Sequence, residues 1–159
     1  MSGVEGITIR RADPSEPEIA AIIAVHNAHS RLHSPEQSIH CLAADQMQGV
    51  DLYAICLGGV PVGCAGLKPL GDGLAEVKSV HVLERVRGRG LSRRLMAHLV
   101  DVSRDGGIGG LVLETGSQML TGFDAARRLY LSLGFVECPP IPGYAPDPAS
   151  SFFRLDLSA

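Results

Sequence analysis

The feature that most constrains the fold of this chain is a glycine-containing junction between a predicted strand and a predicted helix. Residues 74–83 (LAEVKSVHVL) alternate in the manner of a strand, with Val80 and Val82 on one face. Residues 90–104 repeat leucine at the spacing of a helical stripe, and residues 109–115 (GGLVLET) form a second apolar strand. Such a crossover predicts that the two strands run parallel, as neighbours or near-neighbours in one sheet.

The segments around this crossover predict antiparallel strands and further helices. The pair Gly58-Gly59 separates two apolar runs and is typical of a two-residue hairpin. Strands are predicted at 6–11, 50–57, 60–68, 74–83, 109–115, 135–138 and 151–157, and helices begin near Ser15, Ser34, Gly90 and Thr121. The predicted fold class is therefore α+β, with a mixed, mostly antiparallel sheet of six to seven strands and about four helices.

Composition narrows the class of protein. The chain has 159 residues, of which 45% are apolar and 19% charged, which predicts one globular domain over residues 1–159. No stretch approaches the roughly 20 apolar residues of a membrane span, and the start MSGVEGITIR lacks the layout of a signal peptide. We therefore expect a cytoplasmic protein without a membrane partner.

The cysteines and histidines do not indicate a metal centre. The four cysteines form no CxxC pair, and Cys56 and Cys64 lie in apolar runs where small core residues are expected. The histidines cluster near the N-terminal helices without the convergent ligand spacing that zinc requires. No metal site is expected.

The charge of the junction points to an anionic ligand. Five arginines and no acid fall within residues 85–94, although the formal net charge of the chain is −3. Gly88 and Gly90 allow the backbone to approach a ligand closely, and the amides at a helix N-terminus bind anions. A phosphate or pyrophosphate site is the prediction, and a solvated basic turn is the alternative. Neither a P-loop nor the dinucleotide fingerprint fits, because the required lysine and third glycine are missing.

Two segments resemble the GNAT superfamily of N-acetyltransferases. EVKSVHVLERVRGRGLSRRLMAHL resembles the acyl-CoA-binding signature, a strand followed by Arg/Gln-x-x-Gly-x-Gly/Ala, filled here by Arg85, Gly88 and Gly90. LETGSQMLTGFDAARRLYLSLGFVECPPIPGY resembles the second conserved region, in which a helix carrying tyrosine precedes Leu-Gly-Phe. The resemblance covers roughly residues 50–157. Ser92 is one departure, at a position where close relatives often have a small residue such as glycine, and serine is also small.

The resemblance implies a sheet splayed between strands 74–83 and 109–115, with acetyl-CoA in the gap. The pyrophosphate is expected on the amides from Arg87 to Leu91, and the backbone of Val80 and Val82 is expected to pair with the pantetheine arm. The implied coenzyme contacts are Val80, His81, Val82, Arg85, Arg87, Gly88, Arg89, Gly90, Leu91, Ser92 and Tyr130.

Acetyl transfer to an amine requires a proton acceptor, a donor to the developing oxyanion and a proton donor for the departing thiolate. Tyr130 matches the family's tyrosine near the thioester sulfur, and the Val80 amide is the expected oxyanion donor. Glu76 is the first candidate base, on the strand face that alternation gives to Val80. His81 is the second candidate, with its side chain expected to point away from Glu76.

The resulting hypothesis is an acetyl-CoA-dependent N-acetyltransferase. Its acceptor would be a primary amine of a small molecule, an amino acid or a peptide, attacking directly in a ternary complex. The expected acceptor-binding residues are Asn27, His29, Glu76, Ser117 and Tyr144. A non-catalytic acyl-CoA-binding regulatory module is the alternative. A nucleic-acid partner is not expected, because the net charge is negative and aromatic residues are few. A homodimer stays open, because such folds commonly dimerise.

Overall fold

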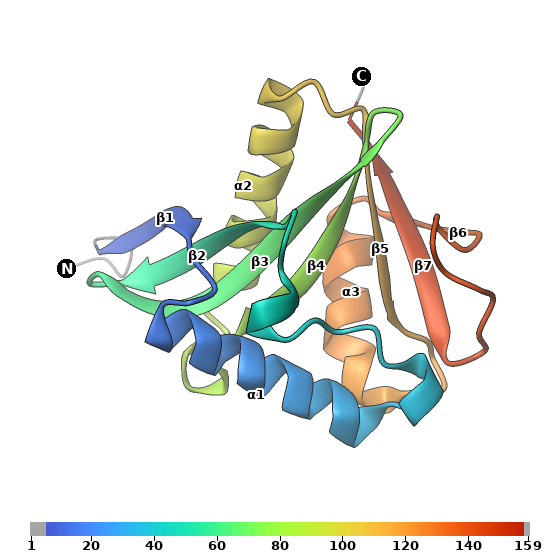
Figure 1. Ribbon diagram of the computed structural model, residues 1–159, viewed down its shortest axis with the longest axis horizontal. Helices are drawn as coiled ribbons and strands as arrows, with labels where there is room; N and C mark the ends of the chain where they lie inside the picture. The colour runs from blue at the N-terminus through green and yellow to red at the C-terminus, as the bar shows by residue number, and fades with distance from the viewer. Residues whose placement is uncertain (1–5, 158–159) are drawn as a thin grey trace.

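The computed structural model describes residues 6–157, which build one seven-stranded sheet (Figure 1). The strands are β1 (Ile7–Ala12), β2 (Asp51–Leu57), β3 (Val60–Gly71), β4 (Leu74–Val82), β5 (Gly110–Gly116), β6 (Val136–Cys138) and β7 (Ser150–Asp156). Their order is β1-β2-β3-β4-β5-β7-β6, and only the β4–β5 pair is parallel. The predicted mixed, mostly antiparallel sheet and its parallel crossover are confirmed.

Three α-helices cover the sheet, α1 (Pro17–His33) on one face and α2 (Leu91–Asp105) and α3 (Asp124–Ser132) on the other (Figure 1). The larger core cluster packs α2 and α3 against the sheet around Leu95, Leu99 and Tyr130. A second cluster packs Ile19, Ile22 and Ile23 of α1 against the opposite face. Cys56 and Cys64 are buried in this second cluster, as their apolar surroundings predict.

The α-helix expected to begin near Ser34 does not form. The segment instead makes two short 3-10 turns, η1 (Glu36–Ser38) and η2 (Ala44–Gln46), joined by extended chain. Of the apolar residues Ile39, Leu42, Ala43 and Met47 in this segment, only Met47 is buried. A helix gains most of its stability by packing an apolar face, and most apolar side chains of this segment are only partly buried.

The sheet splits in two after the first three residues of β4. The parallel ladder of β4 with β5 runs only from Leu74–Gly110 to Glu76–Val112. Past Glu76, β4 pairs with β3 alone, so its other backbone edge faces a gap. The predicted splay is therefore present.

A bulge at Ser79 changes which side chains of β4 share a face. Ser79 has a φ of +57°, and the register of β4 with β3 slips there. Val77 before the bulge and Val82 after it both join the larger core, although five positions separate them. Simple alternation is broken by the extra residue. The expectation that Glu76 shares a face with Val82, and that His81 points to the other, is wrong.

No helix within residues 6–157 has the length and apolar character that crossing a membrane would require.

Candidate active site

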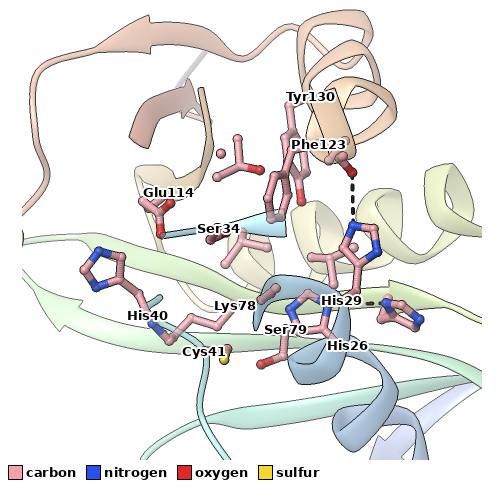
Figure 2. A pocket seen from close by; sticks show the side chains of 18 of the residues that line it. His26, His29, Ser34, His40, Cys41, Lys78, Ser79, Glu114, Phe123 and Tyr130 are labelled. Atoms are coloured by element: carbon pink, nitrogen blue, oxygen red, sulfur yellow. Dashed lines mark hydrogen bonds between the residues drawn. The ribbon is translucent and has the colours of Figure 1, made fainter. Parts of the chain in front are cut away.

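A cavity of about 400 Å³ lies at the gap in the sheet (Figure 2). Its walls come from β4, β5, α1, α3 and the loops on either side of them. The expected site residues that line it are His29, Glu76, Val80, His81, Val82, Arg87, Ser92, Tyr130 and Tyr144. The fold thus brings together residues that lie as far apart in sequence as α1 and the Pro-rich loop at 139–149.

The strand–helix junction has the form of an anion cradle. Gly88 and Gly90 adopt φ values of +83° and +74°, in the left-handed region that favours glycine, and each has open space where a side chain would project. Within residues 6–157, the amides of Gly88, Arg89 and Gly90 donate to no acceptor. These free amides and the N-terminus of α2 fit the pyrophosphate of a coenzyme.

The arginines of the junction divide into two kinds. Arg85 and Arg89 are exposed and free to approach a phosphate. Arg87 folds back, because its Nε donates to the Val82 carbonyl oxygen at 3.0 Å, and it lines the cavity at this end. Arg93 lies farther along α2, where its guanidinium donates to Ser132 Oγ at 2.7 Å.

Tyr130 is anchored in the core, with its ring against Phe135 and Phe153. Burial, and then the nearby Glu114 carboxyl, raise the pKa of the Tyr130 phenol well above its usual range. The hydroxyl therefore keeps its proton at neutral pH. Because Tyr130 also lines the cavity, it is suited to donate a proton or a hydrogen bond there.

Glu76, Lys78 and Tyr144 form a closed set of hydrogen bonds on the cavity wall. The Lys78 ammonium donates to Glu76 Oε2 at 3.1 Å and to the Tyr144 hydroxyl oxygen at 2.9 Å. That hydroxyl donates to Glu76 Oε2 at 2.5 Å. Burial, and then the Glu76 carboxylate, raise the pKa of Tyr144. Glu76 is thus engaged by two neighbours, and Lys78 is a site residue that sequence reasoning missed.

Glu114 is a second acid that sequence reasoning missed. It lies on β5 across the gap, and it lines the same cavity (Figure 2). Burial raises its pKa to about 7, although the Lys78 charge acts in the opposite direction. A carboxyl with this pKa can exchange a proton near neutral pH. Its signal in the sequence is a single acid near the end of an otherwise apolar strand.

The histidines at the cavity are held as structural contacts. His26 Nδ1 of α1 lies 3.3 Å from His81 Nδ1, and burial is the first cause that lowers the pKa of each to about 4. His81 is therefore neutral at pH 7 and a poor proton acceptor. His29 Nε2 lies 3.0 Å from the Gly122 carbonyl oxygen, which joins α1 to the turn η4 (Thr121–Phe123) across the gap.

Two expected acceptor-binding residues do not line this cavity. Asn27 Nδ2 donates to the Leu42 carbonyl oxygen at 2.9 Å, which ties α1 to the loop beside it. Ser117 Oγ donates to the Pro148 carbonyl oxygen at 2.7 Å and anchors the Pro-rich loop. Both side chains are buried, and both hold the walls of the pocket together.

Comparison with known proteins identifies the architecture. The model of the acetyltransferase (GNAT) family matches residues 17–135. The chain belongs to the GNAT acetyltransferase family. It is 33% identical over 152 residues to the uncharacterized N-acetyltransferase YedL of Escherichia coli, covering 94% of both chains. It is 30% identical over 151 residues to the uncharacterized N-acetyltransferase YsnE of Bacillus subtilis, covering 94% of this chain and 99% of that one.

Solved structures of similar fold include one with acetyl-CoA bound. A Klebsiella pneumoniae protein assigned as an acyl-CoA N-acyltransferase superposes with a TM-score of 0.79 at 30% identity, covering 95% of this chain and 97% of that one. Salmonella typhimurium yncA, solved with its cofactor acetyl-CoA, superposes with a TM-score of 0.68 at 28% identity, covering 97% and 95%. This GNAT protein is an acetyl-CoA-dependent acetyltransferase, as the signature at residues 85–90 predicts.

Proposed function

We propose that the chain is a single N-acetyltransferase domain, residues 1–159, whose acceptor is the primary amine of a small molecule, an amino acid or a peptide. The amine attacks directly while acetyl-CoA and acceptor are bound together. One observation carries this proposal: the proton acceptor Glu114 and the proton donor Tyr130 line one cavity, at the gap that also exposes the edge of β4.

In this proposal the junction holds the phosphates of the coenzyme. The free amides of Gly88, Arg89 and Gly90 receive the pyrophosphate, helped by the dipole of α2. Arg85 and Arg89 add positive charge from the solvent side, and buried Leu91 fixes the start of the helix. The further contacts are His81 and Ser92 at the cavity wall, Arg87 at its coenzyme end, and the backbone of Val80 and Val82 along the open strand edge.

The proton transfers use residues on both sides of the gap. Acetyl-CoA supplies the acetyl group as a thioester, so that formation of the C–N bond breaks a C–S bond and releases a thiol. Glu114 accepts the proton of the amine, and the Tyr130 hydroxyl supplies one to the sulfur. The Val80 amide donates to the negative charge that develops on the carbonyl oxygen.

Glu76 has a different part in this scheme. Its Oε2 already accepts hydrogen bonds from Lys78 and Tyr144, which hold the carboxylate in place on the cavity wall. We assign it to anchoring these two side chains in the acceptor pocket. Glu114 replaces it as the first candidate for the base, because its carboxyl lacks this double engagement and its pKa is raised to about 7.

The direct test is thiol release from acetyl-CoA against a panel of amines, amino acids and peptides, with acetyl-CoA binding measured in parallel by calorimetry. Release with a subset of amines, and an N-acetylated product by mass spectrometry, is the expected result. Tight coenzyme binding with no release across a broad panel would instead favour the regulatory module.

A further inference from the structure

Lys78 is an unusual wall residue for a pocket that takes an amine. The side chains of Lys78 and Glu76 are only 10% and 5% exposed, so the ion pair has lost most of its hydration. A buried ion pair stabilises a fold little compared with apolar residues of similar volume. Its presence on a cavity wall therefore calls for a role beyond packing.

The Lys78 ammonium has more N–H donors than acceptors among the described residues. Two of its three N–H groups reach Glu76 and Tyr144, and no third acceptor lies within residues 6–157. Lys78 lines the cavity, and an anionic oxygen bound there is the acceptor that pairs most strongly with an ammonium. An acceptor that carries only an amine offers no such oxygen, and its own ammonium form would be repelled by Lys78.

Among residues 6–157, no other lysine or arginine lines the acceptor side of the cavity. Arg87 lies at the coenzyme end, where it bonds the Val82 carbonyl oxygen. His26 and His81 have pKa values near 4 and carry no charge at pH 7. Burial, and then the charge of Lys78, also lower the pKa of His40. Lys78 is thus the fixed positive charge that a bound acceptor meets.

A negative group faces the same space. In Figure 2, Lys78, His40 and Glu114 gather toward one end of the pocket, and Tyr130, Phe123 and His29 toward the other. The Lys78 charge is near enough to lower the pKa of Glu114 against the effect of burial. One cavity therefore offers a carboxylate to an amine and an ammonium to an anion.

We propose that the acceptor is a small amino acid, whose carboxylate binds the Lys78 ammonium while its amine lies toward Glu114. This inference rests on the proposed N-acetyltransferase function and specifies its substrate class. The cavity of about 400 Å³ favours a small acceptor, because the acetyl end of the coenzyme must share that volume.

The first experiment compares matched acceptors on the wild-type enzyme. The standard amino acids are tested as free acids, as primary amides and as the corresponding decarboxylated amines, with thiol release as the readout. The best free acid is expected to exceed its amide in kcat/KM by at least about ten-fold, the worth of one charge-assisted hydrogen bond. Equal or better turnover of the amide or the amine would overturn the proposal. No thiol release with any of the three kinds of acceptor would contradict the proposed function instead.

The second experiment assigns the preference to Lys78. In Lys78→Met the acid-to-amide ratio is expected to fall to near one, mainly through a higher KM for the acid. Lys68→Met is the matched control, because Lys68 is the chain's only other lysine and is exposed at the end of β3; it is expected to keep the wild-type ratio.

A third variant separates loss of acceptor binding from loss of folding. Lys78→Met/Glu76→Gln removes both charges, so that no unpaired carboxylate is left buried. Calorimetric titration of the preferred amino acid in the presence of coenzyme A is expected to show weakened binding in both Lys78 variants and unchanged binding in Lys68→Met. Full binding of the acid by a folded Lys78 variant would exclude Lys78 as its partner.

Discussion

The Tyr144 hydroxyl donates to Glu76 Oε2 at 2.5 Å and so connects the Pro-rich loop at 139–149 to the third residue of β4. The two residues are 68 positions apart in the sequence. The same loop is held a second time, because Ser38 Oγ donates to Asp147 Oδ2 at 2.5 Å. One wall of the cavity is therefore a loop kept in place by side-chain hydrogen bonds.

Tyr144→Phe tests this connection. The variant keeps the ring contacts with His40 and Phe152 and loses only the hydroxyl. We expect the free energy of unfolding to fall by about 1–3 kcal/mol, because Glu76 and Lys78 each lose a buried partner. The acceptor KM should rise while acetyl-CoA affinity stays unchanged. Tyr53→Phe is a matched control for chemical denaturation, since Tyr53 is buried and its hydroxyl bonds no residue within 6–157.

Gly88→Val is expected to weaken acetyl-CoA binding by ten-fold or more in calorimetry. The added side chain would project into open space where the phosphates are proposed to lie. The left-handed backbone adds a strain of about 1–2 kcal/mol. Gly49→Val separates the two effects, because Gly49 has a similar φ of +79° and open surroundings outside the pocket. An equal loss of coenzyme binding in both variants would argue against the cradle.

Tyr130→Phe is expected to lower kcat by about 10²–10⁴-fold, the range for loss of a positioned proton donor. Coenzyme affinity should change little, because the ring and its contacts with Phe135 and Phe153 remain. Steady-state kinetics and calorimetry on the same preparation check the prediction. Unchanged kcat would remove Tyr130 from the proton transfers.

Glu114 predicts a pH dependence of the reaction. If it accepts the proton of the amine, kcat/KM should rise with pH through about 7, where the carboxyl ionises. Glu114→Gln should lose most activity together with this ionisation. Glu76→Gln is the informative comparison, and it should keep the ionisation near pH 7. A profile in Glu114→Gln identical to the wild type would return the role of base to another group.

The raised pKa of Glu114 also predicts that the stability of the fold falls as the pH rises, whereas kcat/KM rises. Its pKa is higher in the folded chain than in the unfolded one, so the folded state binds more protons between about pH 4.5 and 7. Glu114 therefore makes the fold less stable as the pH rises through that window. Glu114→Gln should be relatively more stable than the wild type above pH 7, as measured by urea unfolding at several pH values. A difference that does not vary with pH would contradict the raised pKa.

The lowered pKa values of His26 and His81 predict that the fold loses stability in acid. Both pKa values are lowered from 6.5 to about 4, so the unfolded chain binds more protons between these values. Their contribution to stability is complete above about pH 6.5 and is lost as the pH falls toward 4. Urea unfolding from pH 7 to 4.5 should show this decline, and it should be shallower in His81→Asn. An equally steep decline in that variant would show that other groups cause it.

The site divides into parts that the sequence reveals and parts that it does not. The glycines at 88 and 90, the helix after them and the tyrosine at 130 are recognised from the chain, because the chemistry of an anion cradle and of a helical stripe is local. Lys78 and Glu114 carry no such pattern. Their importance comes from burial and from partners far away in sequence, which no spacing encodes.

The sequence by itself determined the strand–helix–strand crossover, the glycine-containing junction before the helix and the GNAT family, since each depends on residue types at short, regular spacing. Only the tertiary structure decided the faces of β4, because one bulge at Ser79 reverses the alternation on which the prediction relied. It likewise decided which neighbours each acid at the cavity meets. Glu76 accepts hydrogen bonds from Lys78 and Tyr144, whereas burial raises the pKa of Glu114 on the facing strand to about 7, and neither environment is encoded in local spacing.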